Sequence, residues 1–390
     1  MPPPRAGMPG RAPGPQCAPP GACGRGDNSR HALFDLASND YLGLSSHPRV
    51  RQAAISALNC LGTGATASRV ASGTWQIHRE LEAELSRYTG RSQALVFSSG
   101  YCANLGLLGA LGGPGGLMLL DAHAHASLID GARLSGAGTA RFEHNNLDDA
   151  RAKLHANAQS PAPKPRVVVV VESVYSVLGD AAPPQQLAEL CAQYNALLLI
   201  DEAHSLATVP AGSAVNAAGL AQAENVLVTG TLSKALGAQG GAVLFGGGRA
   251  ELWREHLLNT ARTFIFDTAL APAAAAAAHA ALELATGERI AGLAANALMI
   301  RRVLNAEENL AGRVEQAAGA VQSVRMKSPQ QALLAATLLR EHGIAVTCFR
   351  PPSVPDGISR LRLAAHAQQD PAELAAALKV VARTISDVES

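Results

Sequence analysis

Short apolar runs alternate with helical patterns through the middle of the chain. The runs lie at residues 94–100 (ALVFSSG), 166–173 (RVVVVVES), 195–204 (NALLLIDEAH), 225–234 (NVLVTGTLSK) and 241–245 (GAVLF). β-Branched and aliphatic runs of this length are typical of strands that are buried on both faces of a sheet. Between them lie helical stretches such as PPQQLAELCAQY. The alternation predicts βαβ units and a large α/β domain with a mostly parallel sheet.

The pattern changes after residue 286. Residues 328–343 begin with a Ser-Pro-Gln-Gln capping box and end at a glycine, which predicts a helix. A strand at residues 344–351 (IAVTCFRP) and the segment 360–367 (RLRLAAHA) follow, and DPAE at residues 370–373 caps the last helix. This order predicts a smaller α+β domain beside the large one.

Residues 1–30 are rich in proline, glycine and arginine and nearly free of large apolar residues. Such a segment cannot form a core, and it lacks the apolar region of a secretory signal. We therefore expect a disordered tail at residues 1–30. The rest is predicted to divide into an N-terminal arm that joins the small domain (31–60), a large domain (61–285) and a C-terminal small domain (286–390).

Composition narrows the class of partner. The chain has 390 residues, of which 48% are hydrophobic and 16% charged, and its net charge is +1. This balance gives no indication of binding to nucleic acid or to an anionic membrane, and no apolar run reaches the roughly 18 residues of a membrane span. The six cysteines form no C-x-x-C pair, which indicates reduced thiols in the cytoplasm. A small-molecule ligand is the expected partner.

Three short motifs are set aside because their context is wrong. DEAH at residues 201–204 would need a Gly-rich phosphate loop ending in Gly-Lys-Ser/Thr to indicate a helicase, and the chain has none. GTGATA at residues 62–67 follows a helical pattern rather than a strand, so it is no dinucleotide fingerprint. His123 and His125 have no ligand partners at zinc-like spacing. We predict no metal site.

Lys234 is the only charged residue of the stretch LVTGTLSKALGAQGGAVL at residues 227–244. Pyridoxal phosphate requires a lysine for covalent attachment, an acid for its ring nitrogen and donors for its phosphate. Asp201, at the end of a predicted strand, suits the ring nitrogen, and His204 suits the ring hydroxyl. Taken singly, these residues are equally compatible with a solvated lysine, a helix cap and a core histidine.

Donors for a phosphate lie at two further strand ends, where open α/β sheets bind their ligands. Thr231 and Ser233 offer hydroxyls, and Ser99, Gly100 and Tyr101 offer backbone amides at a strand-to-helix turn. We interpret the combined set as a pyridoxal-phosphate site.

Longer segments resemble the α-oxoamine synthase family of fold-type I pyridoxal-phosphate enzymes. They include LASNDYLGLSSHPRV (36–50), ASRVASGTWQIHRELE (67–82), FSSGYCAN (97–104), ESVYSVLGDAAPP (172–184), GTLSKALG (230–237) and FRPPSVPDGISRLRLAAHA (349–367). Together the matching segments cover nearly everything after the tail. The resemblance implies the aspartate aminotransferase-like fold, a homodimer, and a decarboxylative condensation of an amino acid with an acyl thioester.

The same resemblance implies individual roles. Lys234 carries the cofactor, His125 stacks on its ring, Asp201 pairs with its ring nitrogen, and Glu172 lies near the reacting centre. The other residues implied to hold the cofactor are Gly100, Tyr101, Ser176, His204, Thr231 and, toward the partner subunit's phosphate, Thr268. The implied substrate residues are Asn39 and Arg362 for the amino acid, with Arg350 and Ser353 for the acyl group. Bracing of the proline loop is an equally weighted alternative for Arg350.

Within this family, the segments favour the branch that condenses L-alanine with a pimeloyl thioester in biotin synthesis. The sequence leaves open whether coenzyme A or an acyl carrier protein bears the acyl group. A glycine-using synthase is the alternative reaction, and a fold without turnover is the alternative class. The intact set of Lys234, Asp201, His204 and His125 argues against the latter. Residues 1–30 do not resemble the family's N-terminal helix, so its substrate-contacting arginine has no counterpart here.

Overall fold

The computed structural model describes residues 33–162, 166–354 and 356–390, and the predicted tail lies outside them. The large domain is built on one sheet with strand order β2-β8-β7-β6-β5-β3-β4. Its strands are β2 Gln93–Phe97, β3 Gly116–Asp121, β4 Gly138–Phe142, β5 Arg166–Glu172, β6 Leu197–Asp201, β7 Val226–Thr231 and β8 Gly241–Phe245. The strands β7, β6, β5, β3 and β4, in this order across the sheet, run parallel to one another. Strand β8 is antiparallel to both of its neighbours, β2 and β7. The mostly parallel sheet predicted from the apolar runs is confirmed.

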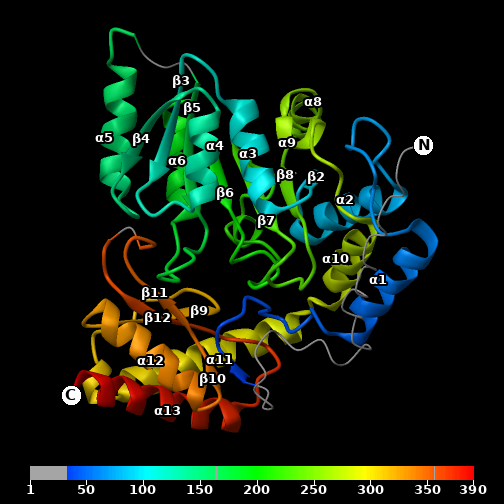
Figure 1. The fold of residues 1–390 in the computed structure, drawn as a ribbon. Coiled ribbons are helices and arrows are strands. Elements are labelled where there is room, and N and C mark those ends of the chain that lie inside the picture. The colour runs from blue at the N-terminus through cyan, green and yellow to red at the C-terminus, as the bar shows by residue number, and fades with distance from the viewer. Residues whose placement is uncertain (1–32, 163–165, 355) are drawn as a thin grey trace, which may run out of the picture.

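Helices cover both faces of this sheet (Figure 1). One face packs against α3 Gly100–Leu111, α4 Ala126–Leu134, α8 Ala250–Thr260 and α9 Arg262–Ile265. The other packs against α2 Gln76–Thr89, α5 Leu147–Ala158, α6 Pro184–Gln193, α7 Ala214–Ala217 and α10 Pro272–Leu284. Because alternate side chains of a strand point to opposite faces, β5 is buried from Val167 to Glu172.

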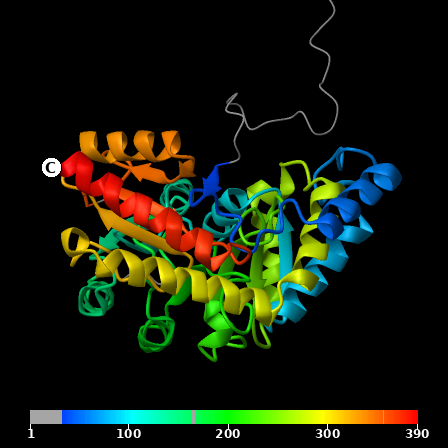
Figure 2. The same cartoon turned by 90° about the horizontal axis from the view of Figure 1, so that it is seen from below.

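The small domain forms a second layer below the large one (Figures 1 and 2). Its sheet has the order β11-β12-β9. Its elements are α11 Gly287–Ala306, η1 Glu308–Leu310, β9 Val321–Arg325, α12 Pro329–Glu341, β11 Thr347–Phe349, β12 Arg360–Ala364 and α13 Pro371–Glu389. Both predicted caps form: Ser328 accepts from the Gln331 amide, and Asp370 from the Ala372 amide.

The prediction of a single strand at residues 344–351 is wrong. The segment contains two short strands, β10 Ile344–Ala345 and β11, which belong to different sheets. β10 pairs with β1 Phe34–Asp35 of the N-terminal arm, while β11 pairs with β12. The chain changes partner at Val346, and a pattern of apolar residues does not reveal such a change.

The N-terminal arm runs along the small domain before it joins the large one. The Ala364 amide donates to the Leu36 carbonyl and the Ala367 amide to the Tyr41 carbonyl, each over 2.8 Å. Helix α1 (Pro48–Leu61) then packs on α10. The division of the chain into domains stays a prediction, although α11 does begin at the Thr286 cap. In the described parts of the chain, every helix is too short or too polar to span a membrane.

Candidate active site

Neighbouring parallel strands bring three polar residues to one edge of the large sheet. Glu172 ends β5 directly opposite Asp201 at the end of β6, and Thr231 ends β7. They open into a cavity of about 270 Å³, which we call the Asp201 cavity. Its lining residues are Ser99, Gly100, Tyr101, Asn104, His125, Ser127, Glu172, Asp201, Ala203, His204, Thr231, Ser233 and Lys234. The tertiary structure therefore gathers most of the predicted cofactor residues at one site.

Lys234 lies in the turn between β7 and β8, with its Nζ atom 2.8 Å from Nε2 of His204. Burial disfavours the ammonium form and lowers the pKa of Lys234 to about 8, although Asp201, and Glu172 when it is ionised, act in the opposite direction. A pKa this low leaves an appreciable fraction of the amine neutral near physiological pH. A neutral amine is the form that attacks a carbonyl or accepts a proton.

His204 is held from its other side by Tyr41 of the N-terminal arm. The Tyr41 hydroxyl lies 2.7 Å from Nδ1 of His204 and donates to Oδ1 of Asn39 over 3.0 Å. Burial, together with the charges of Lys234 and Arg362, holds the pKa of His204 well below its ordinary value, so the ring is neutral. Since the Tyr41 proton goes to Asn39, we assign the ring proton to Nδ1. Nε2 is then free to accept from Lys234.

Asp201 is positioned by two donors. Its Oδ2 atom accepts from Nδ2 of Asn104 over 2.7 Å, and its Oδ1 atom accepts from the Ala203 amide over 2.9 Å. Asn104 also donates to the Ser127 hydroxyl, so helices α3 and α4 both hold the carboxylate in place. An oriented, nearly buried carboxylate is suited to pair with a cationic ring nitrogen.

Glu172 and His125 are joined through the backbone. Oε1 of Glu172 accepts from the His125 amide over 2.8 Å. Burial and the neighbouring charge of Asp201 raise the pKa of Glu172 to about 8. Burial lowers the pKa of His125, whose Nδ1 lies 2.8 Å from the Ser127 hydroxyl. His125 therefore presents a neutral ring to the cavity.

The first residues of α3, Gly100 and Tyr101, line the Asp201 cavity. Helix α3 begins at Gly100 and is capped by Ser99, which accepts from the Cys102 amide. A Cβ atom on Gly241 would lie 2.4 Å from the Gly100 nitrogen, so only glycine lets β8 approach this turn. The Thr231 hydroxyl lies 2.7 Å from that of Ser233 in the same cavity. Helix amides beside two hydroxyls fit a phosphate.

A second cavity of about 510 Å³ meets the first at His125, His204 and Lys234, and we call it the Arg362 cavity. Arg362 donates from Nη2 to Oδ1 of Asn39 and from Nε to the Ser176 carbonyl, over 2.8 Å in each case. Arg360, two residues earlier on β12, is instead ion-paired with Asp356 and Glu315. Of these two arginines, Arg362 is the one that lines the cavity.

Three predicted site residues lie at or beyond the edge of these cavities. Tyr101 is 45% exposed and donates to Asp130 at the rim of the Asp201 cavity. Ser353 lines the Arg362 cavity, whereas Arg350 is exposed and is not among its lining residues. Thr268 is exposed and lines neither cavity of its own chain.

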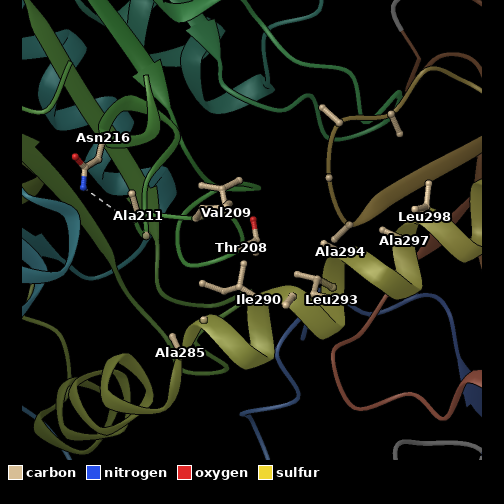
Figure 3. Close-up of a pocket in the computed structure, with 18 of the residues that line it drawn as sticks. Thr208, Val209, Ala211, Asn216, Ala285, Ile290, Leu293, Ala294, Ala297 and Leu298 are labelled. Carbon is tan, nitrogen blue, oxygen red and sulfur yellow. Dashed lines mark hydrogen bonds between the residues drawn. The ribbon is translucent and has the colours of Figure 1, made fainter. Parts of the chain in front are cut away.

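A larger cavity, of about 860 Å³, lies elsewhere, between α11 and the loop at residues 208–212. Figure 3 shows Ile290, Leu293 and Ala294 of α11 facing Thr208 and Val209 across it. Its walls are mainly apolar, and Lys234, Asp201 and His204 are absent from its lining. Size alone therefore does not identify the reactive site.

The comparisons with known proteins agree with this geometry. Residues 32–381 match the model of the family described as aminotransferase class I and II. The chain belongs to that family. It is 46% identical to the 8-amino-7-oxononanoate synthase of Mycolicibacterium paratuberculosis, with 91% of this chain and 89% of the relative covered. The enzyme of the same name from Mycobacterium leprae is also 46% identical, over 91% of this chain and 88% of its own length.

Solved structures of the aminotransferase class I and II fold superimpose on the chain. A serine palmitoyltransferase from S. paucimobilis, described with PLP and myriocin bound, has a TM-score of 0.84 and 31% identity, and covers 91% of this chain and 87% of its own. An 8-amino-7-oxononanoate synthase from Francisella tularensis has a TM-score of 0.75 and 24% identity, and the match covers 92% of this chain and 99% of the other. At this identity the likeness supports the fold alone. The predicted fold-type I architecture and the prediction of a pyridoxal-phosphate-dependent acyltransferase are confirmed.

Sequence reasoning missed three residues of this family member's site. Tyr41 connects His204 to Arg362, and Asn104 and Ser127 orient Asp201 and His125. Tyr41 and Asn104 both lie inside quoted family segments, SNDY and FSSGYCAN, but nothing in the pattern marks them as polar contacts of the site. Their position in those segments was the only available signal.

Proposed function

We propose that the enzyme condenses L-alanine with a pimeloyl thioester, with loss of carbon dioxide, to form 8-amino-7-oxononanoate for biotin synthesis. The names of the curated relatives support this choice of reaction. The observation that carries it is the meeting of two cavities at Lys234: one suits the cofactor, and the other holds an arginine suited to an amino-acid carboxylate. Glycine in place of alanine is the alternative, and product analysis decides between them.

The donor set of the Asp201 cavity fits pyridoxal phosphate. The helix amides at Gly100 and Tyr101, with the hydroxyl of Thr231, would hold the phosphate. Asp201 would pair with the ring nitrogen, and His125 would stack on the ring. His204 would contact the ring oxygen region together with Ser176, which lines the adjoining Arg362 cavity. When bound, the cofactor supplies an electron sink that stabilises negative charge at the amino acid's α-carbon.

Proton transfer is the part of the reaction that we assign to Lys234. Its depressed pKa makes Nζ a base that takes the α-proton of the amino acid. Nε2 of His204, 2.8 Å away, accepts a hydrogen bond from Nζ and so directs the nitrogen lone pair. Glu172, mostly protonated at neutral pH because its pKa is raised to about 8, limits the negative charge near this base.

Arg362 and Asn39 bind the amino-acid carboxylate in this proposal. Arg362 is almost fully buried, and a guanidinium in such surroundings forms strong hydrogen bonds with a carboxylate. Asn39 and the Ser176 carbonyl fix the guanidinium plane before substrate arrives. Preorganisation of this kind reduces the entropy lost on binding.

Ser353 and Arg350 are assigned to the acyl substrate. Ser353 lines the Arg362 cavity beside Phe349, so this end combines an apolar wall with a hydroxyl. Arg350 lies on the exposed part of the same segment, where a cation suits the phosphates of coenzyme A or the acidic surface of an acyl carrier protein. The proposal does not choose between these carriers.

We further propose a cytoplasmic homodimer whose two sites lie at the subunit interface. Thr268 is exposed and lines neither cavity of its own chain, which suits a role at the partner subunit's phosphate site. Leu252 on α8 and Phe266, directly after α9, are exposed by 62% and 69% and suit burial against a second copy.

Product analysis tests the proposed reaction. The purified enzyme with pyridoxal phosphate is incubated with carboxyl-labelled alanine or glycine and with pimeloyl or acetyl coenzyme A. We expect labelled carbon dioxide and 8-amino-7-oxononanoate with alanine and the pimeloyl thioester. Higher kcat/KM with glycine and acetyl coenzyme A would replace this reaction with the glycine alternative. No product with any pair would overturn the proposed condensation.

A further inference from the structure

His123 lines the Arg362 cavity, yet the proposed reaction gives it no role. It lies in the turn between β3 and α4, two residues before His125, where its backbone amide donates to Oδ1 of Asp121 over 2.7 Å. The sequence presented it only as a metal ligand without partners. Its surroundings indicate a different use.

The ring of His123 is fixed by a second histidine. It stacks on His144 with ring centroids 3.8 Å apart and ring planes inclined by 15°. His144 itself is immobilised, because Nδ1 lies 2.8 Å from Oδ1 of Asp121 and Nε2 lies 2.9 Å from Oδ2 of Asp180. The Tyr175 ring packs against His144 at an interplanar angle of 85°, with ring centroids 4.5 Å apart. His123 therefore stacks on a side chain that its own contacts hold in place.

The two rings carry different charges. Burial alone would lower the pKa of His144, but its hydrogen bonds to Asp121 and Asp180 outweigh burial and raise that pKa to about 9. His144 is therefore a cation at neutral pH. Burial and the adjacent His144 cation lower the pKa of His123, which is therefore neutral.

A neutral imidazole has one N–H donor and one acceptor, and only one nitrogen of His123 is accessible. Nδ1 is buried and has no hydrogen-bond partner among the described residues. Nε2 is neither buried nor hydrogen-bonded there, so it is the polar atom that His123 presents to the cavity. Buried N–H groups without an acceptor are rarer than unused acceptors, which places the proton on Nε2.

The charges around His123 select the ligand group. The carboxylates of Asp121, Asp180 and Asp356 all act on its ring electrostatically. These carboxylates are themselves paired, Asp121 and Asp180 with the His144 cation and Asp356 with Arg360. His123 is neutral and offers a substrate carboxylate no cation, whereas Arg362 in the same cavity does. An uncharged carbonyl oxygen is therefore the better match for the neutral N–H of His123.

We propose that His123 is a substrate-binding residue whose Nε2–H donates a hydrogen bond to the thioester carbonyl oxygen of the acyl substrate. The inference rests on the proposed function, because it takes an acyl thioester as the occupant of the Arg362 cavity. It adds a specificity element to this chain: the cavity distinguishes a thioester from a ligand that lacks the carbonyl.

Two ligands and two variants test this role. Binding of pimeloyl coenzyme A is compared, by calorimetry on the cofactor-loaded enzyme, with binding of the thioether in which a methylene replaces the thioester carbonyl. The wild type should prefer the thioester by about three- to tenfold, the range for one neutral hydrogen bond. His123→Phe keeps a ring on His144 but has no donor, so its preference should vanish. His123→Gln has an amide donor near the position of Nε2 and should keep most of it.

The outcomes separate the possible roles. If His123→Phe still binds the thioester more tightly than the thioether, the ring serves only to pack on His144 and the proposal is overturned. The proposal is also overturned if only His123→Gln loses the preference for the thioester. Should His123→Phe fail to fold, His123→Leu replaces it, with the melting temperature and the cofactor absorbance measured for each variant. If wild-type enzyme binds neither ligand, the proposed function fails together with this inference; if it binds both equally, only the inference fails.

Discussion

Nζ of Lys234 and the hydroxyl of Tyr41 lie on opposite sides of one imidazole, 2.8 Å from Nε2 and 2.7 Å from Nδ1 of His204. The same hydroxyl accepts from Nη2 of Arg362 over 3.0 Å. The N-terminal arm thereby connects the lysine at the centre of the site to the arginine of the small domain.

Lys234→Ala should abolish the covalent attachment of pyridoxal phosphate and lower kcat by about 10²–10⁴-fold or more. The fold should persist, because the lysine lies in a turn and not in a packed strand. Borohydride reduction followed by mass spectrometry checks the linkage. Lys379→Ala, on the exposed face of α13, is the matched control and should retain it. A reducible linkage in Lys234→Ala would show that another lysine carries the cofactor.

Tyr41→Phe should lower kcat/KM by about three- to tenfold, because His204 and Arg362 both lose a hydrogen-bond partner. The pH at which the bound cofactor's absorbance changes should also shift, since His204 no longer directs Nζ of Lys234. Tyr88→Phe is the control: its hydroxyl donates to the Ala285 carbonyl, away from both reactive cavities. Equal effects of the two variants would contradict a specific role for Tyr41.

Asp201→Asn should bind pyridoxal phosphate but lose about 10²-fold or more in kcat, since a neutral amide cannot stabilise a cationic ring nitrogen. Its shape is preserved, so the contact with Asn104 can be kept by rotation of the amide. Cofactor content is measured by absorbance and turnover by product formation. Near-normal turnover would mean that another residue pairs with the ring nitrogen.

Glu172→Gln should change how stability depends on pH in enzyme freed of cofactor. Burial raises the pKa of Glu172 from 4.5 to about 8, so between these values the folded state holds a proton that the unfolded state has lost. This contribution to stability is present below pH 4.5 and is lost as pH rises to about 8. Relative to Glu172→Gln, the wild type should lose on the order of 3 kcal/mol between about pH 5 and pH 8.5 in urea unfolding. Parallel curves for the two proteins would show that the carboxyl titrates normally.

Arg362→Ala should raise the KM for alanine by about 10- to 100-fold, the cost of a lost hydrogen bond to a charged group. Arg350→Ala should raise the KM for the pimeloyl thioester by no more than about fivefold, because exposed charges are weakened by solvent. Steady-state kinetics in each substrate, with the other saturating, measure both. Arg360→Ala would break the ion pairs with Asp356 and Glu315, so its expected effect is a lower melting temperature. Equal losses for both substrates in both variants would refute this division of roles.

Local chemistry in the sequence was enough to predict the fold class and the cofactor lysine. The run from Val167 to Val171 indicates a doubly buried strand, because five consecutive valines suit a surface that is covered on both faces. Ser328 and Asp370 mark helix starts, because a side-chain oxygen at that position satisfies free amides of the first turn. Lys234 is conspicuous because an uncharged stretch surrounds it; the chemistry of the cofactor then predicted Asp201 and His204, and the family resemblance added His125 and Glu172.

Only the tertiary structure decided which of these groups touch and what their charge states are. Tyr41 and His204 are 163 positions apart, and their hydrogen bond depends on the packing of the arm against the small domain. Arg360 and Arg362 share a strand face, yet only Arg362 lines the cavity, because Arg360 is ion-paired with Asp356 and Glu315. The depressed pKa of Lys234 and the raised pKa of Glu172 arise from burial beside other charges. Burial and distance are properties of the folded chain, because they are created when strand ends from different parts of the sequence meet at one edge of the sheet.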